Sequence, residues 1–182
     1  EQVLFCNECV FSNQRPLSTD EYRHTTSSKK DTLQFNEGGV CKACEQMHVF
    51  YNEIDWQQRE EELIVLLDRH RKNGATYDVL VPGSGGKDSI YAAHVLKYKY
   101  NMNPLTVTWS PLKYTDIGWS NLQANIHSGF SNLLCTPNGS FQRKLARLCL
   151  EELGDAFHVF VLGQIAYPFQ LAVKLGIPLV FY

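Results

Sequence analysis

The sequence has no apolar run that approaches membrane-spanning length, and its N-terminus has no basic region followed by an apolar one. We therefore expect a cytoplasmic protein without a membrane partner. An excess of positive charge is also absent, because 17 Lys and Arg residues are set against 19 Asp and Glu residues, for a net charge of -2. This balance does not indicate nucleic acid as the main partner. With 182 residues, 44% of them hydrophobic, and no internal repeat, the chain is long enough for one α/β domain with a small appendage.

The two ends of the chain are unusual. The sequence opens on Glu1 rather than Met, and it stops on the apolar stretch 177–182, which reads as a core strand. Natural termini are usually polar and loosely held. We expect a partial chain that is truncated at its C-terminus.

A glycine-rich stretch at residues 82–89, with the sequence PGSGGKDS, is the feature that organises the rest. Residues 77–81 before it predict a buried strand, and residues 90–98 after it predict a helix. A turn between a strand and a helix directs unpaired backbone N–H groups and the positive end of the helix dipole at one point. Its glycines let a bulky anion approach the backbone, and Lys87 adds a point charge. The stretch predicts a phosphate-binding loop, and the alternative is a tight turn without a ligand.

The common phosphate-loop templates do not fit this stretch. In a Walker A loop Val81 would have to be Gly, and Ser or Thr would have to follow Lys87 where Asp88 stands. The dinucleotide fingerprint would need Gly at position 88. The segment Ser84–Ser89 resembles instead the PP-loop of the ATP pyrophosphatases, which split ATP between the α- and β-phosphates and adenylate a substrate oxygen.

Two cysteine motifs, Cys6-x-x-Cys9 and Cys41-x-x-Cys44, stand 31 residues apart near the N-terminus. Each pair can offer two thiolates to one ion from a tight turn, so that two pairs complete a tetrahedral site. The motifs predict a structural Zn²⁺ site that holds a segment with little core of its own. An iron–sulfur cluster could use the same ligands. A disulfide pair is disfavoured in a cytosolic chain, and a redox motif usually starts a helix after a strand.

Four other side chains bear on this interpretation. His24 and His48 could replace a ligand, although four cysteines already suffice, and His48 is expected on a linking helix. Cys135 and Cys149 stand in no paired motif and are expected to be buried packing residues.

The remaining sequence divides into three predicted segments. Residues 1–50 form the zinc-binding segment, residues 51–76 a linking helix, and residues 77–182 the ATP-binding domain. The linking helix is expected to begin at Asp55 and to end at Gly74. Further strands are expected at 105–109, 131–135 and 177–182, and further helices at 117–128, 141–153 and 166–175. This alternation predicts an α/β fold with a doubly wound parallel sheet.

Ligands of open parallel sheets lie at the carboxyl ends of the strands. Thr108 and Trp109 end the predicted strand 105–109, so we expect them beside an adenosine, although Trp109 could equally be a core residue. Three basic residues, Arg143, Lys144 and Arg147, recur at helical spacing. They could contact phosphates or an acidic sugar, but a solvated helix face is the commoner explanation.

Taken together, the motifs resemble one PP-loop branch, the N-acetyl sugar amidotransferases of bacterial surface-polysaccharide (lipopolysaccharide O-antigen) and nonulosonic-acid biosynthesis. The matching pieces are the cysteine motifs, residues 82–89, the Thr-Pro-Asn-Gly at 136–139, and the pairs 154–155 and 163–164. The resemblance implies an adenine nucleotide alpha hydrolase-like fold and conversion of a sugar acetamido group to an acetamidino group. The amide oxygen is adenylated, ammonia attacks, and AMP and pyrophosphate are released. Ammonia would come from a partner glutaminase, because the chain has no glutamine-hydrolysing nucleophile motif.

The resemblance also implies roles for single residues. The backbone around Gly83, Gly85 and Gly86 would hold the departing pyrophosphate with the hydroxyls of Ser84 and Ser89. Lys87 would neutralise charge on the phosphates, and Asp88 would hold Mg²⁺. Gly163 would stand near the α-phosphate, although Gln164 follows it where related enzymes have histidine and acidic residues.

Two other functions fit parts of the sequence. A PP-loop tRNA-modifying enzyme of the thiolase type would have a basic surface and a cysteine pair near ATP, and neither is evident here. A nucleotide-binding module without chemistry would bind ATP and release no pyrophosphate.

Overall fold

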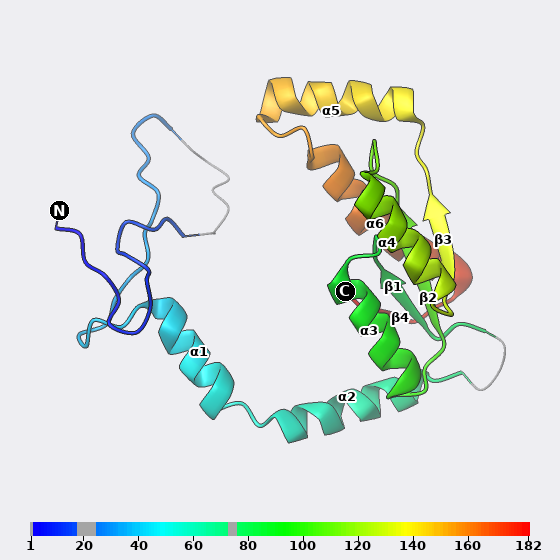
Figure 1. Ribbon diagram of the computed structural model, residues 1–182, viewed down its shortest axis with the longest axis horizontal. Coiled ribbons are helices and arrows are strands. Elements are labelled where there is room, and N and C mark those ends of the chain that lie inside the picture. The colour runs from blue at the N-terminus through cyan, green and yellow to red at the C-terminus, as the bar shows by residue number, and fades with distance from the viewer. Residues whose placement is uncertain (1, 18–24, 73–75) are drawn as a thin grey trace. The chain divides into compact units, whose positions relative to one another are not determined.

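The computed structural model describes residues 2–17, 25–72 and 76–182. The chain divides into two compact units, Glu1–Arg59 and Glu60–Tyr182 (Figure 1). Each unit is described by itself below.

The N-terminal unit has little regular structure before α1 (Lys42–Asn52). Three isolated antiparallel bridges join Phe5 to Ser12, Pro16 to Thr32 and Phe35 to Cys41. The buried members of its core cluster are Cys6, Leu33 and Cys41. So small an apolar cluster stabilises a fold weakly, and a unit of this size usually needs a metal or a disulfide in addition.

The predicted linking helix corresponds to the second of two consecutive helices. Helix α1 ends at Asn52, and α2 (Trp56–His70) follows after a short break. The predicted start at Asp55 is confirmed, because its Oδ1 accepts a hydrogen bond from the backbone N–H of Gln58 at 3.0 Å. The predicted end at Gly74 lies outside the described residues.

A four-stranded parallel sheet forms the centre of the second unit. Its strands are β1 (Val79–Pro82), β2 (Pro104–Trp109), β3 (Ser131–Cys135) and β4 (Leu179–Val180). Their order across the sheet is β3-β2-β1-β4, and all pairs are parallel. The chain therefore adds strands on one side of β1 and then returns to its other side, which confirms the doubly wound fold.

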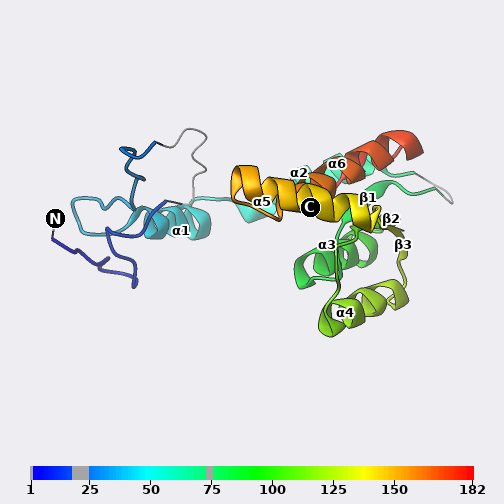
Figure 2. The same cartoon turned by 90° about the horizontal axis from the view of Figure 1, so that it is seen from above.

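Four helices connect these strands: α3 (Lys87–Tyr98), α4 (Asp116–His127), α5 (Gly139–Leu153) and α6 (His158–Leu175). Helices α3 and α4 cover one face of the sheet and α6 covers the other (Figure 2). The direction of winding reverses between β1 and β4. In sheets of this kind, ligands bind outside the carboxyl ends of the strands at that point.

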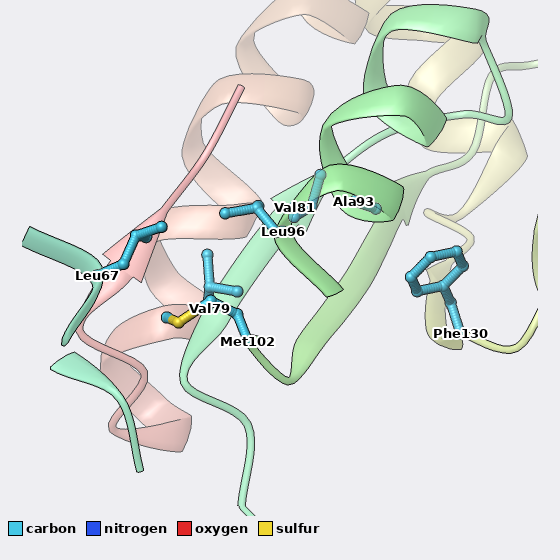
Figure 3. Packing of buried hydrophobic residues seen from close by; sticks show 7 residues of the cluster. All are labelled: Leu67, Val79, Val81, Ala93, Leu96, Met102 and Phe130. Atoms are coloured by element: carbon cyan, nitrogen blue, oxygen red, sulfur yellow. The ribbon is translucent and has the colours of Figure 1, made fainter. Parts of the chain in front are cut away.

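Side chains of β1 alternate between the two faces of the sheet. Val79 and Val81 pack with α3 through Ala93 and Leu96, in the cluster drawn in Figure 3. Leu80 between them belongs to the cluster on the α6 face. Strand β1 is buried on both faces, which fits the continuous apolar run in its sequence.

Helix α6 corrects one prediction. A helix was expected over residues 166–175, yet α6 begins eight residues earlier and runs without interruption from His158 to Leu175. It also contains Pro168, whose missing N–H leaves the carbonyl of Gln164 without its helical donor. The hydroxyl of Tyr182 donates to that carbonyl at 3.3 Å, so the segment after β4 replaces the lost bond.

Among the described residues, no single helix is long and apolar enough to cross a membrane, although α5 and α6 together, bent by 119°, meet the limits of length and composition.

Candidate functional site

The glycine-rich stretch forms the turn between β1 and α3, as predicted. Gly83 still donates its backbone N–H to Val107 O at 2.9 Å, and Gly86 is the N-cap of α3 with an extended backbone and no capping side chain. Within the described part of the chain, the backbone N–H groups of residues 84–89 form no hydrogen bond. A run of free N–H groups at a helix N-terminus is the arrangement that binds phosphate oxygens.

Gly85 fixes the shape of this turn. Its φ of 89° is in the left-handed region, and a Cβ there would lie 2.7 Å from the backbone nitrogen of Leu122 in α4. The turn therefore packs directly on the backbone of α4, and only glycine allows both the conformation and the contact. This contact holds the loop on its outer side.

A pocket of about 370 Å³ opens beside the loop at the carboxyl ends of the strands. One side of the pocket is the loop itself: Pro82, Gly83, Ser84, Gly86, Asp88 and Ser89. The other side is more apolar and comes from β2, α6 and the segment after β4: Val107, Trp109, Gln164, Ile165, Pro168 and Tyr182. The pocket thus joins a wall of free amides to an aromatic and aliphatic wall, which suits a ligand with a charged end and a flat apolar end.

The charged side chains of the loop are open to solvent. Lys87 Nζ lies 2.6 Å from Asp88 Oδ1, with the two side chains 90% and 89% exposed. A pair this exposed contributes little to stability, so both groups are available to a ligand. Ser89 Oγ donates to Gly86 O at 3.1 Å and stiffens the first turn of α3.

The two strand-end residues that were expected beside an adenosine, Thr108 and Trp109, differ in whether they line the pocket. Trp109 lines the pocket. Thr108 has 0% of its surface exposed and is absent from the lining, because alternate residues of β2 face opposite sides of the sheet. The side chain of Thr108 therefore does not line the pocket. Thr108 Oγ1 instead donates to Gly83 O in the loop at 2.7 Å.

Gly163 was likewise expected near the ligand. It lies inside α6 and does not line the pocket, and a Cβ on it would stand 2.2 Å from Cε2 of Trp109. Its small size lets the indole of Trp109 pack flat on the backbone of α6. Gly163 therefore shapes the pocket wall through Trp109, and its expected place near a phosphate stays a prediction.

The four cysteines of the two CxxC motifs come together in the N-terminal unit. Their sulfur atoms all lie within 4.8 Å of one another, with Cys6 Sγ 3.9 Å from Cys44 Sγ and Cys9 Sγ 3.6 Å from Cys41 Sγ. These distances are far too long for disulfide bonds of about 2.05 Å. Four sulfurs around one Zn²⁺ at about 2.3 Å would be about 3.8 Å apart in a regular tetrahedron. The observed spacing fits one tetrahedral ion.

The surroundings of Cys6 favour its thiolate, whereas those of Cys44 favour the thiol. The backbone N–H groups of Glu8 and Cys41 donate to Cys6 Sγ at 3.4 and 3.2 Å. Burial raises the pKa of the Cys6 thiol, but these hydrogen bonds outweigh burial and lower its pKa to about 6. Contact with the thiol of Cys9, together with burial, raises the pKa of Cys44.

The first cysteine motif is tied to the turn before the second. Asn7 donates its backbone N–H to Gly39 O at 3.0 Å and its side-chain amide to Gly38 O at 2.8 Å. Gly39 has a φ of 74°, as a tight turn before the second motif requires. These bonds hold the two motifs in register, independent of any ion.

The other candidate ligands stand apart from this cluster. His48 lies in α1, and its Nε2 is 2.8 Å from Glu8 Oε2. His24 lies outside the described residues. Cys135 and Cys149 are both partly exposed, so the expectation that they are buried is corrected. Cys135 pairs with Trp109 in the register of β2 and β3, which puts one thiol, and not a cysteine pair, at the pocket edge of the sheet.

Comparison with known proteins gives limited matches. No protein-family model matches the chain. An uncharacterized protein of Methanocaldococcus jannaschii is 33% identical over 84 residues, which is 46% of this chain and 29% of that protein. The chain thus spans less than a third of the length of this relative. Among solved structures, an NH3-dependent NAD synthetase from Campylobacter jejuni in complex with nitrate aligns with a TM-score of 0.49 at 12% identity, over 69% of this chain and 56% of that one. Neither match assigns a family or a reaction.

Five pocket residues were not predicted as site residues from the sequence: Val107, Gln164, Ile165, Pro168 and Tyr182. Tyr182 carried one usable signal, because it follows the last strand of a parallel sheet, where ligands bind. No feature of the sequence pointed to Gln164 or Pro168. They reach the pocket because α6 crosses the sheet beside Trp109, which only the tertiary structure reveals.

Proposed function

We propose that the protein binds ATP at the β1–α3 turn and uses it, as a PP-loop enzyme, to activate an amide for attack by ammonia. The observation that carries this proposal is the row of free amides at residues 84–89, in a loop that lines a pocket whose far wall is aromatic and aliphatic. The triphosphate would bind to these amides, and the adenine would lie toward Trp109 and Tyr182.

Lys87 and Asp88 would have complementary roles at the phosphates. Both are exposed beside the free amides, so neither must be drawn from the core to meet ATP. Lys87 would neutralise the charge that grows on the leaving pyrophosphate. The carboxylate of Asp88 would hold Mg²⁺, which binds carboxylate and phosphate oxygens and would withdraw charge from them.

The reaction we propose converts an N-acetyl group of a sugar into an acetamidino group. The amide oxygen attacks the α-phosphorus, the bond to the β-phosphate oxygen breaks, and pyrophosphate leaves. Ammonia then adds to the activated carbon, AMP departs with the former amide oxygen, and a proton is lost to give the amidine. A glutaminase partner would supply the ammonia. The four cysteines fit Zn²⁺, which would stabilise the N-terminal unit rather than take part in these steps.

The direct test supplies Mg-ATP, ammonium and a panel of free and nucleotide-linked acetamido sugars. We expect AMP and pyrophosphate to form only with an accepted sugar, and mass spectrometry to find the amidine. Lys87→Ala should lower the rate about 10²–10³-fold, the loss typical of one group that stabilises transition-state charge. Lys174→Ala is the matched control, because Lys174 is an exposed lysine in the last turn of α6, away from the loop. Equal rates for the two variants would contradict the proposal.

Two other functions remain outcomes of the same assay. A tRNA-modifying thiolase would show salt-dependent tRNA binding and no sugar-dependent AMP. The single thiol at the pocket edge, Cys135, gives that function only one of the two cysteines it would require. A binding module would take up ATP and release no pyrophosphate with any acceptor.

A further inference from the structure

We propose that Thr108, together with Asn132, holds the phosphate loop in position from beneath. The two residues form a buried polar support that does not contact the ligand directly. This inference rests on the proposed function, because it concerns how the same loop is held for ATP. Thr108 and Asn132 come from β2 and β3, two strands that do not contain the loop.

The contact to the loop is a single hydrogen bond from a buried side chain. Thr108 Oγ1 lies 2.7 Å from Gly83 O, at the residue where β1 passes into the loop. Gly83 also donates its N–H to Val107 O, so both polar groups of its peptide backbone are held by β2. Because Thr108 is fully buried, water cannot replace its hydroxyl if that hydroxyl is removed.

Asn132 orients the hydroxyl of Thr108. Its side-chain oxygen, Oδ1, lies 3.2 Å from Thr108 Oγ1 and 2.9 Å from Thr106 Oγ1. Its side-chain nitrogen, Nδ2, is buried without a hydrogen-bond partner in the described structure. A hydroxyl has one hydrogen, and Thr108 and Thr106 use theirs on the carbonyls of Gly83 and Ser131. Both hydroxyls can then only accept from Asn132. Turning the amide by 180° puts its NH₂ group at both hydroxyls and gives each of them a donor and an acceptor.

This arrangement explains why threonine, a polar residue, occupies a fully buried position under the loop. It makes Thr108 and Asn132 positioning residues, because they act on the ligand only through the backbone of Gly83. The loop is thereby fixed on two sides, by α4 against Gly85 and by Thr108 beneath Gly83.

Thr106 provides a matched control within the same strand. It is also buried, with 3% of its surface exposed, and it contacts the same Asn132, but its hydroxyl donates to Ser131 O in β3 and not to the loop. Thr106→Val and Thr108→Val therefore remove the same group from equivalent burial, and only the second removes a bond to the loop. Thr108→Ser keeps the hydroxyl and should restore the wild-type properties.

The experiment measures binding of Mg²⁺ with a non-cleavable ATP analogue, and amide hydrogen exchange without nucleotide, in the full chain. We expect Thr108→Val to bind the analogue about tenfold more weakly than Thr106→Val, as the loss of one buried hydrogen bond partner implies. We also expect the Gly83 amide to exchange about tenfold faster in Thr108→Val only. Thermal unfolding of the two valine variants should be similar, which separates positioning from global stability.

The outcomes distinguish this inference from the proposed function. If wild type binds the analogue and the two valine variants match each other in binding and in Gly83 exchange, the support is refuted and the ATP site stands. If wild type binds no nucleotide, the ATP site is refuted, and the exchange rate of Gly83 alone decides whether Thr108 holds the loop. Failure of Thr108→Ser to restore that rate would also refute it.

Discussion

Gly85→Ala tests the contact that shapes the phosphate loop. The substitution forces a side chain into a backbone with φ of 89°, which costs about 1–2 kcal/mol for a residue other than glycine. Its Cβ would also lie 2.7, 2.8 and 2.9 Å from backbone atoms of Leu122 and Asn121, which cannot turn aside as a side chain could. Overpacking of this kind costs about 1–3 kcal/mol more. We expect a total loss of about 2–5 kcal/mol in the free energy of unfolding.

Gly86→Ala is the matched control for this change. Gly86 is the next residue in the chain, its φ is -71°, and an added Cβ would meet nothing within 4 Å. Alanine there should change the unfolding free energy by less than about 1 kcal/mol and can be slightly stabilising. Thermal unfolding followed by circular dichroism should place Gly85→Ala about 6–15 °C below Gly86→Ala, at about 2–4 °C per kcal/mol. Similar melting temperatures would refute the described packing of the loop on α4.

Three further predictions concern other parts of the chain. Removing metal with a chelator, or replacing Cys9 by Ser, should unfold the N-terminal unit and leave the sheet intact, because that unit has so small a core. The readout is a loss of far-UV circular dichroism signal together with a loss of proteolytic resistance confined to residues before Arg59. A chelator without effect would contradict this prediction. Gly163→Ala should displace Trp109 from α6 and change its fluorescence, whereas Ala166→Gly, at an exposed position of the same helix, should not. Hydrogen bonding from Lys99 and Tyr100, and the charge of Lys99, lower the pKa of Glu60. Glu60→Gln should therefore lower the free energy of unfolding at pH values above the ordinary pKa of a glutamate, and this difference from wild type should fade as the pH drops through the lowered pKa. A difference in unfolding free energy that is independent of pH would contradict the prediction.

The strands, the doubly wound order and the cysteine cluster could be predicted because their signals are local. The run YDVLV followed by glycines specifies a strand and a turn within a dozen residues, and two CxxC motifs specify four neighbouring sulfurs whatever lies between them. The glycine of the loop in the left-handed region, Gly85, stands inside the motif that pointed to it.

The far wall of the pocket could not be predicted in the same way. Gln164 and Pro168 reach it through a helix that packs against a strand more than fifty residues earlier in the sequence. The role of Gly163 came from the resemblance alone, and only the position of the Trp109 indole shows that this glycine allows close packing. The burial of Thr108 could have been predicted, because the alternation of strand residues places it on the face of β2 opposite to Trp109.

The most direct test of the account is a crystal structure of the protein with Mg²⁺ and a non-cleavable ATP analogue. The account predicts that the β- and γ-phosphates accept hydrogen bonds from backbone N–H groups between Ser84 and Ser89, with Lys87 turned from Asp88 toward them and the adenine against Trp109. A triphosphate bound anywhere else on the protein would contradict it.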